Sequence, residues 1–105
     1  MFCAVYRMIV KPGMTDQFVT AWTERTKQIY QHCGSLGSRL HGVSEQEFIA
    51  YAQWPSREQW INFSVPESVD QSYGNQMRES CALIETIYEL EVIADLLTCE
   101  PYIKA

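Results

Sequence analysis

Residues 47–60, Glu-Phe-Ile-Ala-Tyr-Ala-Gln-Trp-Pro-Ser-Arg-Glu-Gln-Trp, contain the change from strand to helix that decides the fold. The pattern predicts a strand over residues 47–54. Pro55 ends this strand because proline has no amide hydrogen to donate to a neighbouring strand. Ser56 and Gln59 then have the spacing of a capping box, so the next helix is expected to begin here.

Two further strands precede this segment. One is predicted over residues 36–42 and is joined to 47–54 by a polar turn at 43–46. The other covers residues 2–10, which are rich in residues that favour strands, and Lys11-Pro12-Gly13 ends it sharply. The sequence therefore predicts a strand, a long connection and then a hairpin.

The long connection has the pattern of a helix. Thr15 is the expected N-cap, and Gly34 is the expected glycine just past the helix end. Apolar residues recur between them along one stripe at helical spacing, namely Phe18, Trp22, Ile29 and Cys33.

The second half of the chain repeats this order. Pro66 breaks the helix that begins after Ser56, and a further helix is predicted over residues 67–81. Alternating residues then predict a last strand over 87–94. The order βαββαβ is that of an α+β, ferredoxin-like fold with an antiparallel sheet. One face of such a sheet is bare in a monomer, so a homodimer is expected.

Composition limits the function classes. The 105 residues are 47% hydrophobic and 20% charged, which predicts a single globular domain over 1–105, with its core at about 2–97 and a C-terminal tail at 98–105. Eight basic against thirteen acidic residues, a net charge of −5, argue against a nucleic-acid partner. No apolar run is long enough for a signal peptide or a membrane span.

The four cysteines, Cys3, Cys33, Cys81 and Cys99, match no zinc-binding pattern, and no metal site is expected. They are expected to be free thiols, which favours a reducing cytoplasm.

The chain resembles the antibiotic biosynthesis monooxygenase family over about residues 2–97. The resemblance rests on the first strand with Lys11-Pro12-Gly13, on Phe18-x-x-x-Trp22, on residues 34–41 and on the junction from Tyr51 to Trp60. It implies a ferredoxin-like protomer that pairs into a dimeric α/β barrel. It also implies oxygenation of a small aromatic, quinol- or anthrone-like, substrate by O₂ without metal, flavin or haem, hence no cofactor.

Two other functions fit the same resemblance. One is a non-catalytic dimer that binds a small ligand, and the other is an isomerase on the same barrel. Haem degradation, known in related enzymes, is disfavoured because Tyr6 and Phe63 stand where those enzymes have Asn and Trp, and no histidine follows His41.

Arg39 and His41 are the candidate catalytic residues. They lie two apart on one strand and so share a face. A turn at 43–46 pairs His41 with Phe48 and Arg39 with Ala50, beside alanines that leave space for a pocket. Arg39 would stabilise a developing anion there, and His41 would transfer a proton near neutral pH. The alternative is a solvated pair on an edge strand.

The candidate substrate-binding residues are mostly aromatic. Each tryptophan is expected in the core or in a cavity wall. Arg7 lies in an apolar strand and is expected to pair with Glu89 or Glu91, and Tyr51 is expected on the face opposite Arg39. The full set is Trp22, Trp54, Trp60, Tyr51 and Arg7.

Overall fold

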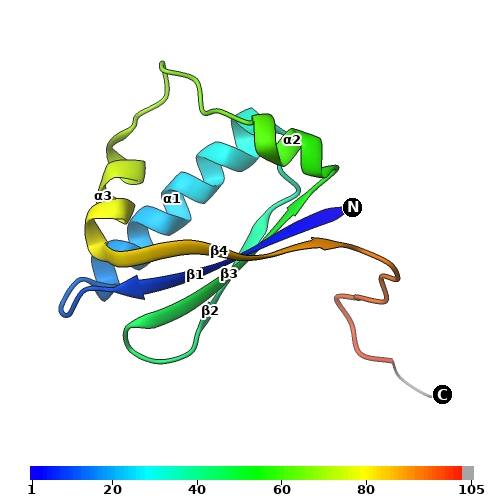
Figure 1. Cartoon of the computed structure of the whole chain (residues 1–105), viewed down its shortest axis with the longest axis horizontal. Helices are drawn as coiled ribbons and strands as arrows, with labels where there is room; N and C mark the ends of the chain where they lie inside the picture. Colours follow the sequence, from blue (N-terminus) through cyan, green and yellow to red (C-terminus); the bar gives the residue numbers. More distant parts are fainter. Residues whose placement is uncertain (103–105) are drawn as a thin grey trace.

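The strands pair into one antiparallel sheet with the spatial order β2-β3-β1-β4 in the computed structural model, which describes residues 1–102 (Figure 1). The strands are β1 (Phe2–Val10), β2 (Ser38–Gly42), β3 (Glu47–Trp54) and β4 (Cys81–Glu91). The helices are α1 (Thr15–Cys33), α2 (Arg57–Asn62) and α3 (Ser72–Ser80). All three lie on one face of the sheet, the helix-covered face, and the other is an open face (Figure 1). The predicted ferredoxin-like α+β fold is confirmed.

The second half of the chain departs from the predicted boundaries. The helix expected over residues 67–81 covers only α3, which begins at Ser72. The Asp70 carboxylate accepts a hydrogen bond from the Ser72 amide at 2.9 Å, which holds the chain in a turn just before the helix. The last strand was expected at 87–94 but already begins at Cys81. It forms a long edge strand, whose pairing with β1 is interrupted by two irregularities.

The helix ends follow the local sequence with one exception. Thr15 is the first residue of α1 and not its N-cap, because its hydroxyl group donates to the Glu45 carbonyl oxygen at 3.0 Å instead. Gly34 ends α1 with a φ of 79°, a left-handed conformation that favours glycine. The Ser56 hydroxyl group accepts from the Gln59 amide at 3.2 Å, which confirms the predicted cap of α2.

The predicted register of the β2–β3 hairpin is wrong by one residue. Arg39 pairs with Tyr51 and His41 with Ile49, because Gly42 pairs with Phe48 and not with Glu47. The Val43 amide donates to the Glu47 carbonyl oxygen at 2.9 Å, and the Ser44 hydroxyl group accepts from the amides of residues 46 and 47. A slip of one residue moves every side chain of a strand to the other face of the sheet.

The core lies between the helix-covered face and the helices, and it has two parts. One cluster surrounds Phe18 of α1, whose ring centroid lies 5.1 Å from that of Phe48. The other surrounds Trp54, whose ring lies 4.8 Å from that of Phe63. Within residues 1–102, no helix is both long enough and apolar enough to cross a membrane. The four cysteines are free thiols, as predicted.

Candidate functional site

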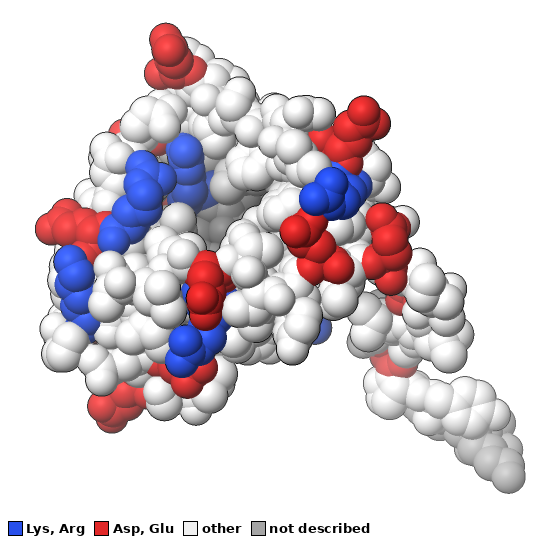
Figure 2. Space-filling view, viewed as in Figure 1, with Lys and Arg blue, Asp and Glu red and all other residues white. Residues whose placement is uncertain are grey.

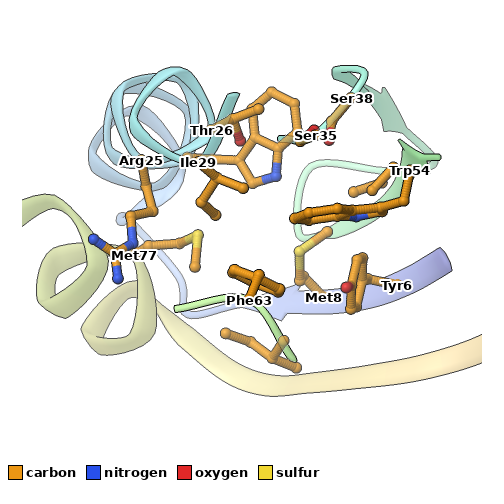
Figure 3. A pocket seen from close by; sticks show the side chains of 14 residues that line it. Tyr6, Met8, Arg25, Thr26, Ile29, Ser35, Ser38, Trp54, Phe63 and Met77 are labelled. Carbon is orange, nitrogen blue, oxygen red and sulfur yellow. The ribbon is translucent and has the colours of Figure 1, made fainter. Parts of the chain in front are cut away.

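A cavity of about 210 Å³ lies between the helix-covered face of the sheet and the helices (Figure 3). Figure 2 shows a hollow in the surface, and positively charged side chains gather at one rim of it. The residues that line the cavity come from all four strands, from α1 and α3, and from the segments that follow α1 and α2. They are Tyr6, Met8, Trp22, Arg25, Thr26, Ile29, Ser35, Ser38, Ala50, Ala52, Trp54, Phe63, Met77 and Ile84.

The cavity exists because β3 carries two small residues between two large ones on its helix-covered face. Phe48 and Trp54 fill the two ends of that face, whereas Ala50 and Ala52 between them carry only a methyl group. All four side chains are buried. The space that two large side chains would occupy is thus left empty, with aromatic and sulfur-containing side chains around it.

Tyr6 supplies a hydroxyl group to the cavity from the middle of β1. The Trp60 Nε1–H of α2 donates a hydrogen bond to the Tyr6 oxygen at 2.6 Å. Burial raises the pKa of Tyr6, and the hydrogen bond from Trp60 opposes this shift less strongly. Tyr6 is therefore a neutral phenol at physiological pH. Within residues 1–102 its own proton has no protein acceptor, so it can be donated to a molecule in the cavity.

Arg25 supplies a positive charge to the cavity from α1. Its Nη1 donates to the Gln28 side-chain oxygen at 3.2 Å, and its guanidinium group packs against Gly74 of α3. A Cβ atom at Gly74 would lie 3.1 Å from Arg25 Nε. Burial and then the nearby charge of Arg78 lower the pKa of Arg25. None of the ion pairs in the described part of the chain includes Arg25 or Arg78.

The sequence model of the antibiotic biosynthesis monooxygenase family matches residues 1–65, more than half of the chain. The chain belongs to the antibiotic biosynthesis monooxygenase family. Among curated proteins, no sequence matches it.

Solved structures similar to this family member share its fold at low sequence identity. SnoaB, a cofactor-independent oxygenase from Streptomyces nogalater, is 12% identical over 90% of this chain and 95% of its own, with a TM-score of 0.72. Rv0793 from Mycobacterium tuberculosis is 11% identical over 91% of this chain and 98% of its own, with a TM-score of 0.69. A protein from Chloroflexus aurantiacus is 18% identical over 90% and 94%, with a TM-score of 0.72.

The three tryptophans predicted to bind substrate lie on the helix-covered side of this family member. Trp22 and Trp54 line the cavity, and Trp54 is also part of the core. Trp60 does not line it but holds the Tyr6 hydroxyl group and packs against Phe2 at 5.3 Å between ring centroids. Trp54 thus belongs to the core and also lines the cavity, two locations that the sequence left as alternatives.

Arg39, His41 and Tyr51 lie on the open face, away from the cavity. The observed register places Arg39 and His41 on the face of Tyr51, and not with the alanines as expected. Both are exposed. Tyr51 accepts a hydrogen bond from the Cys3 thiol at 2.7 Å, and this contact raises the pKa of Tyr51. Arg39 and Tyr51 line an open groove together with Leu97, and Tyr51 also borders a second groove beside Cys3.

Arg7 is also on the open face, in an ion pair with partners other than those expected. Its Nε lies 2.8 Å from Glu47 and its Nη1 3.6 Å from Glu85. Glu89 instead pairs with Arg57 of α2 at 2.6 Å, on the helix-covered side. The expected pairing with Glu89 or Glu91 is wrong because β4 begins earlier than predicted, which places Glu85 opposite Arg7.

Neither Tyr6 nor Arg25 was predicted from the sequence as a site residue, although both carry a signal. Tyr6 has the parity of the buried residues Phe2, Ala4 and Met8 of β1. Arg25 lies on the apolar stripe of α1, three residues after Trp22 and four before Ile29. A polar side chain on the inward stripe of an element signals a cavity or a buried hydrogen bond.

Proposed function

We propose that this family member is a cofactor-independent monooxygenase that oxygenates a small aromatic, quinol- or anthrone-like, substrate in the helix-side cavity. The observation that carries the proposal is the hydrogen-bonded Tyr6 hydroxyl group, which faces an otherwise largely apolar cavity of about 210 Å³. An apolar cavity with a few placed polar groups suits a flat aromatic ring. The oxygenase activity of SnoaB, a structural neighbour, is consistent with this chemistry.

The proposed reaction draws its electrons from the substrate. A quinol- or anthrone-like substrate first loses a proton, from a phenolic hydroxyl group or from a ring CH₂ group. A ring C–H carbon of the resulting anion forms a C–O bond with O₂, and the peroxide anion takes up a proton to give a hydroperoxide. The remaining C–H proton then leaves as the O–O bond breaks. The ring carbon keeps one oxygen atom as a carbonyl group, and the departing hydroxide takes up a proton to become water. No external reductant is required.

Tyr6 would lower the barrier by hydrogen bonding to the substrate oxygen on which negative charge develops. Because its pKa is raised, the phenol acts as a donor and not as a base. The apolar walls exclude water, which strengthens this hydrogen bond. None of the residues that line the cavity is a carboxylate or a histidine, so the first proton passes to water at the mouth.

Filling the cavity is expected to slow turnover strongly. Ala52→Leu places a larger side chain in the space between Trp54 and Phe48, so the rate of O₂ uptake with a reduced naphthoquinone should fall at least about tenfold. Overpacking of this kind costs about 1–3 kcal/mol of stability, so melting curves should show that the variant is folded. An oxygen electrode and chromatography of the product measure the reaction, with protein-free buffer as the background.

Ala82→Leu is the matched control because Ala82 is exposed at the start of β4 and does not line the cavity. Its O₂ uptake should equal that of the wild type. Uptake by the wild type at the protein-free rate would contradict the oxygenase, and isomerisation or binding without turnover would then be the functions to test. Equal inhibition by both variants would contradict the site.

We also propose that the protein is a homodimer joined through the open face. Three apolar side chains of β4 point from this face and are exposed by 38%, 61% and 41%: Leu83, Tyr88 and Leu90. Residues 93–97, with exposed Ile93 and Leu96, continue from the same edge and border the groove at Cys3 and Tyr51. A second copy would cover both surfaces. The free thiols support the further proposal of a reducing, cytoplasmic location.

Leu90→Asp is expected to give monomers because it places a charge in the centre of the proposed interface. Light scattering of the wild type should give twice the chain mass of 12.2 kDa, and that of Leu90→Asp should give the single-chain mass. Ile61→Asp, at an exposed position of α2 on the other side of the sheet, should remain dimeric. A monomeric wild type would contradict the dimer.

A further inference from the structure

The mouth of the cavity carries an excess of positive charge. Arg25 lines the cavity, and the charge of Arg78 on α3 is close enough to lower the pKa of Arg25. The chain has thirteen acidic and only eight basic residues. Even so, within residues 1–102 no carboxylate lies within 4.0 Å of either guanidinium group. Lys11 and Arg39 also lack an acidic partner there, but neither lines the cavity.

The placement of Arg25 is unfavourable without an anionic partner. A guanidinium group that is partly withdrawn from water and close to a second one loses hydration and is repelled by the like charge. Its one hydrogen bond within residues 1–102 is to the neutral Gln28 side chain, and it packs against Gly74. The other N–H groups have no protein acceptor among the described residues, so they can bind an anion at the mouth.

Arg25 and Tyr6 lie on opposite sides of the cavity, with Phe63 between them and Trp54 on the side of Tyr6 (Figure 3). A ligand that touched both would therefore carry an anionic group at one end and an oxygen substituent at the other. The volume limits what lies between these ends. A cavity of about 150 Å³ holds benzene, and ordinary ligand sites begin at about 300 Å³. The observed 210 Å³ thus suits one aromatic ring, or two with the second near the mouth.

We infer that the ligand is an aromatic carboxylate of one or two rings, whose carboxylate group binds Arg25. A carboxylate matches the planar, two-pronged donor set of a guanidinium group. The ring lies in the apolar part of the cavity, and its oxygen substituent reaches Tyr6. The inference rests on the proposed function in that it names the substrate class of the same cavity. Its test is binding, which does not require turnover.

The test compares 2-naphthoate with 2-naphthamide, which has a similar shape but no charge, by isothermal titration calorimetry of the full chain. The wild type should bind 2-naphthoate about tenfold more tightly or better, as expected for hydrogen bonds to a charged group. Arg25→Gln should bind both compounds equally. Arg25→Lys keeps the charge but not the planar donor pair, and it should retain part of the preference.

Lys27→Gln is the matched control because it removes one positive charge two residues along the same helix, from a side chain that does not line the cavity. It should keep the full preference for 2-naphthoate. Three results would each overturn the inference. One is that the wild type fails to bind 2-naphthoate, and another is that it binds both compounds equally. The third result is a preference for 2-naphthoate that is unchanged in both Arg25→Gln and Arg25→Lys. If Arg25→Gln does not fold, Arg25→Lys alone decides between these outcomes.

Turnover separates this inference from the proposed function. Carboxylate preference without O₂ uptake on hydroxylated naphthoates would leave the inference standing and would contradict the monooxygenase. O₂ uptake on neutral quinols without any carboxylate preference would leave the monooxygenase standing and would contradict the inference. The two proposals therefore fail by different measurements.

Discussion

Replacement of Tyr6 by phenylalanine is expected to lower kcat for O₂ uptake about 100-fold, with a much smaller effect on KM. The substitution removes only the hydroxyl group that faces the cavity and leaves the ring in place. A donor that meets charge developing in the transition state contributes roughly this much, because its hydrogen bond strengthens as the reaction proceeds. Steady-state oxygen consumption with a reduced naphthoquinone measures both constants.

His41→Ala is the control for this experiment and should have the kcat of the wild type, because His41 is exposed on the open face. The catalytic role predicted for Arg39 and His41 rested on the hairpin register that the fold does not have. If His41→Ala were inactive and Tyr6→Phe fully active, the active site would lie on the open face, and the proposed site in the helix-side cavity would be wrong.

The pH dependence gives a second test of Tyr6. Burial raises its pKa, so the phenol is protonated at every pH below its ordinary value and can donate throughout that range. Activity that depends on this donor is lost only as the pH rises through the raised pKa. The ratio of wild-type to Tyr6→Phe activity should therefore stay constant from weakly acid to weakly basic pH.

Replacement of Phe18 by alanine is expected to destabilise the fold by about 3–5 kcal/mol. Phe18 is 0% exposed and packs against Phe48 in the cluster that joins α1 to the sheet. Removal of its ring takes away buried apolar area and leaves a void that the rigid sheet cannot close. A domain of this size has about 5–15 kcal/mol of stability, so much of it would be lost. Urea unfolding followed by far-UV circular dichroism measures the change.

Val19→Ala is the comparison because Val19 is the next residue of α1 and is 39% exposed. The free energy of unfolding should change by no more than about 0.5 kcal/mol. Both variants are compared with the wild type at one protein concentration, since the proposed dimerisation would make stability concentration-dependent. A loss below about 1 kcal/mol for Phe18→Ala would mean that the packing of α1 on the sheet is not as described.

Much of the fold follows from short-range patterns. The strand at 2–10, the helix that ends at Gly34 and the strand at 47–54 all have the expected bounds within a residue. Each ends at a residue whose backbone chemistry prevents continuation, or at a glycine that permits a left-handed turn. The start of β4 was missed because residues 81–86 have no partner nearby in the sequence, and only pairing with β1 makes them a strand.

By itself, the sequence determined the family, the α+β order and the aromatic character of the site, because these depend on residue type and on periodicity over a few residues. The tertiary structure alone decided which face carries the cavity. A hairpin register shifted by one residue placed Arg39 and His41 on the open face, and packing of α1 over the sheet brought Tyr6 and Arg25 to one cavity. Register and the meeting of distant elements depend on long-range pairing, which no local pattern contains.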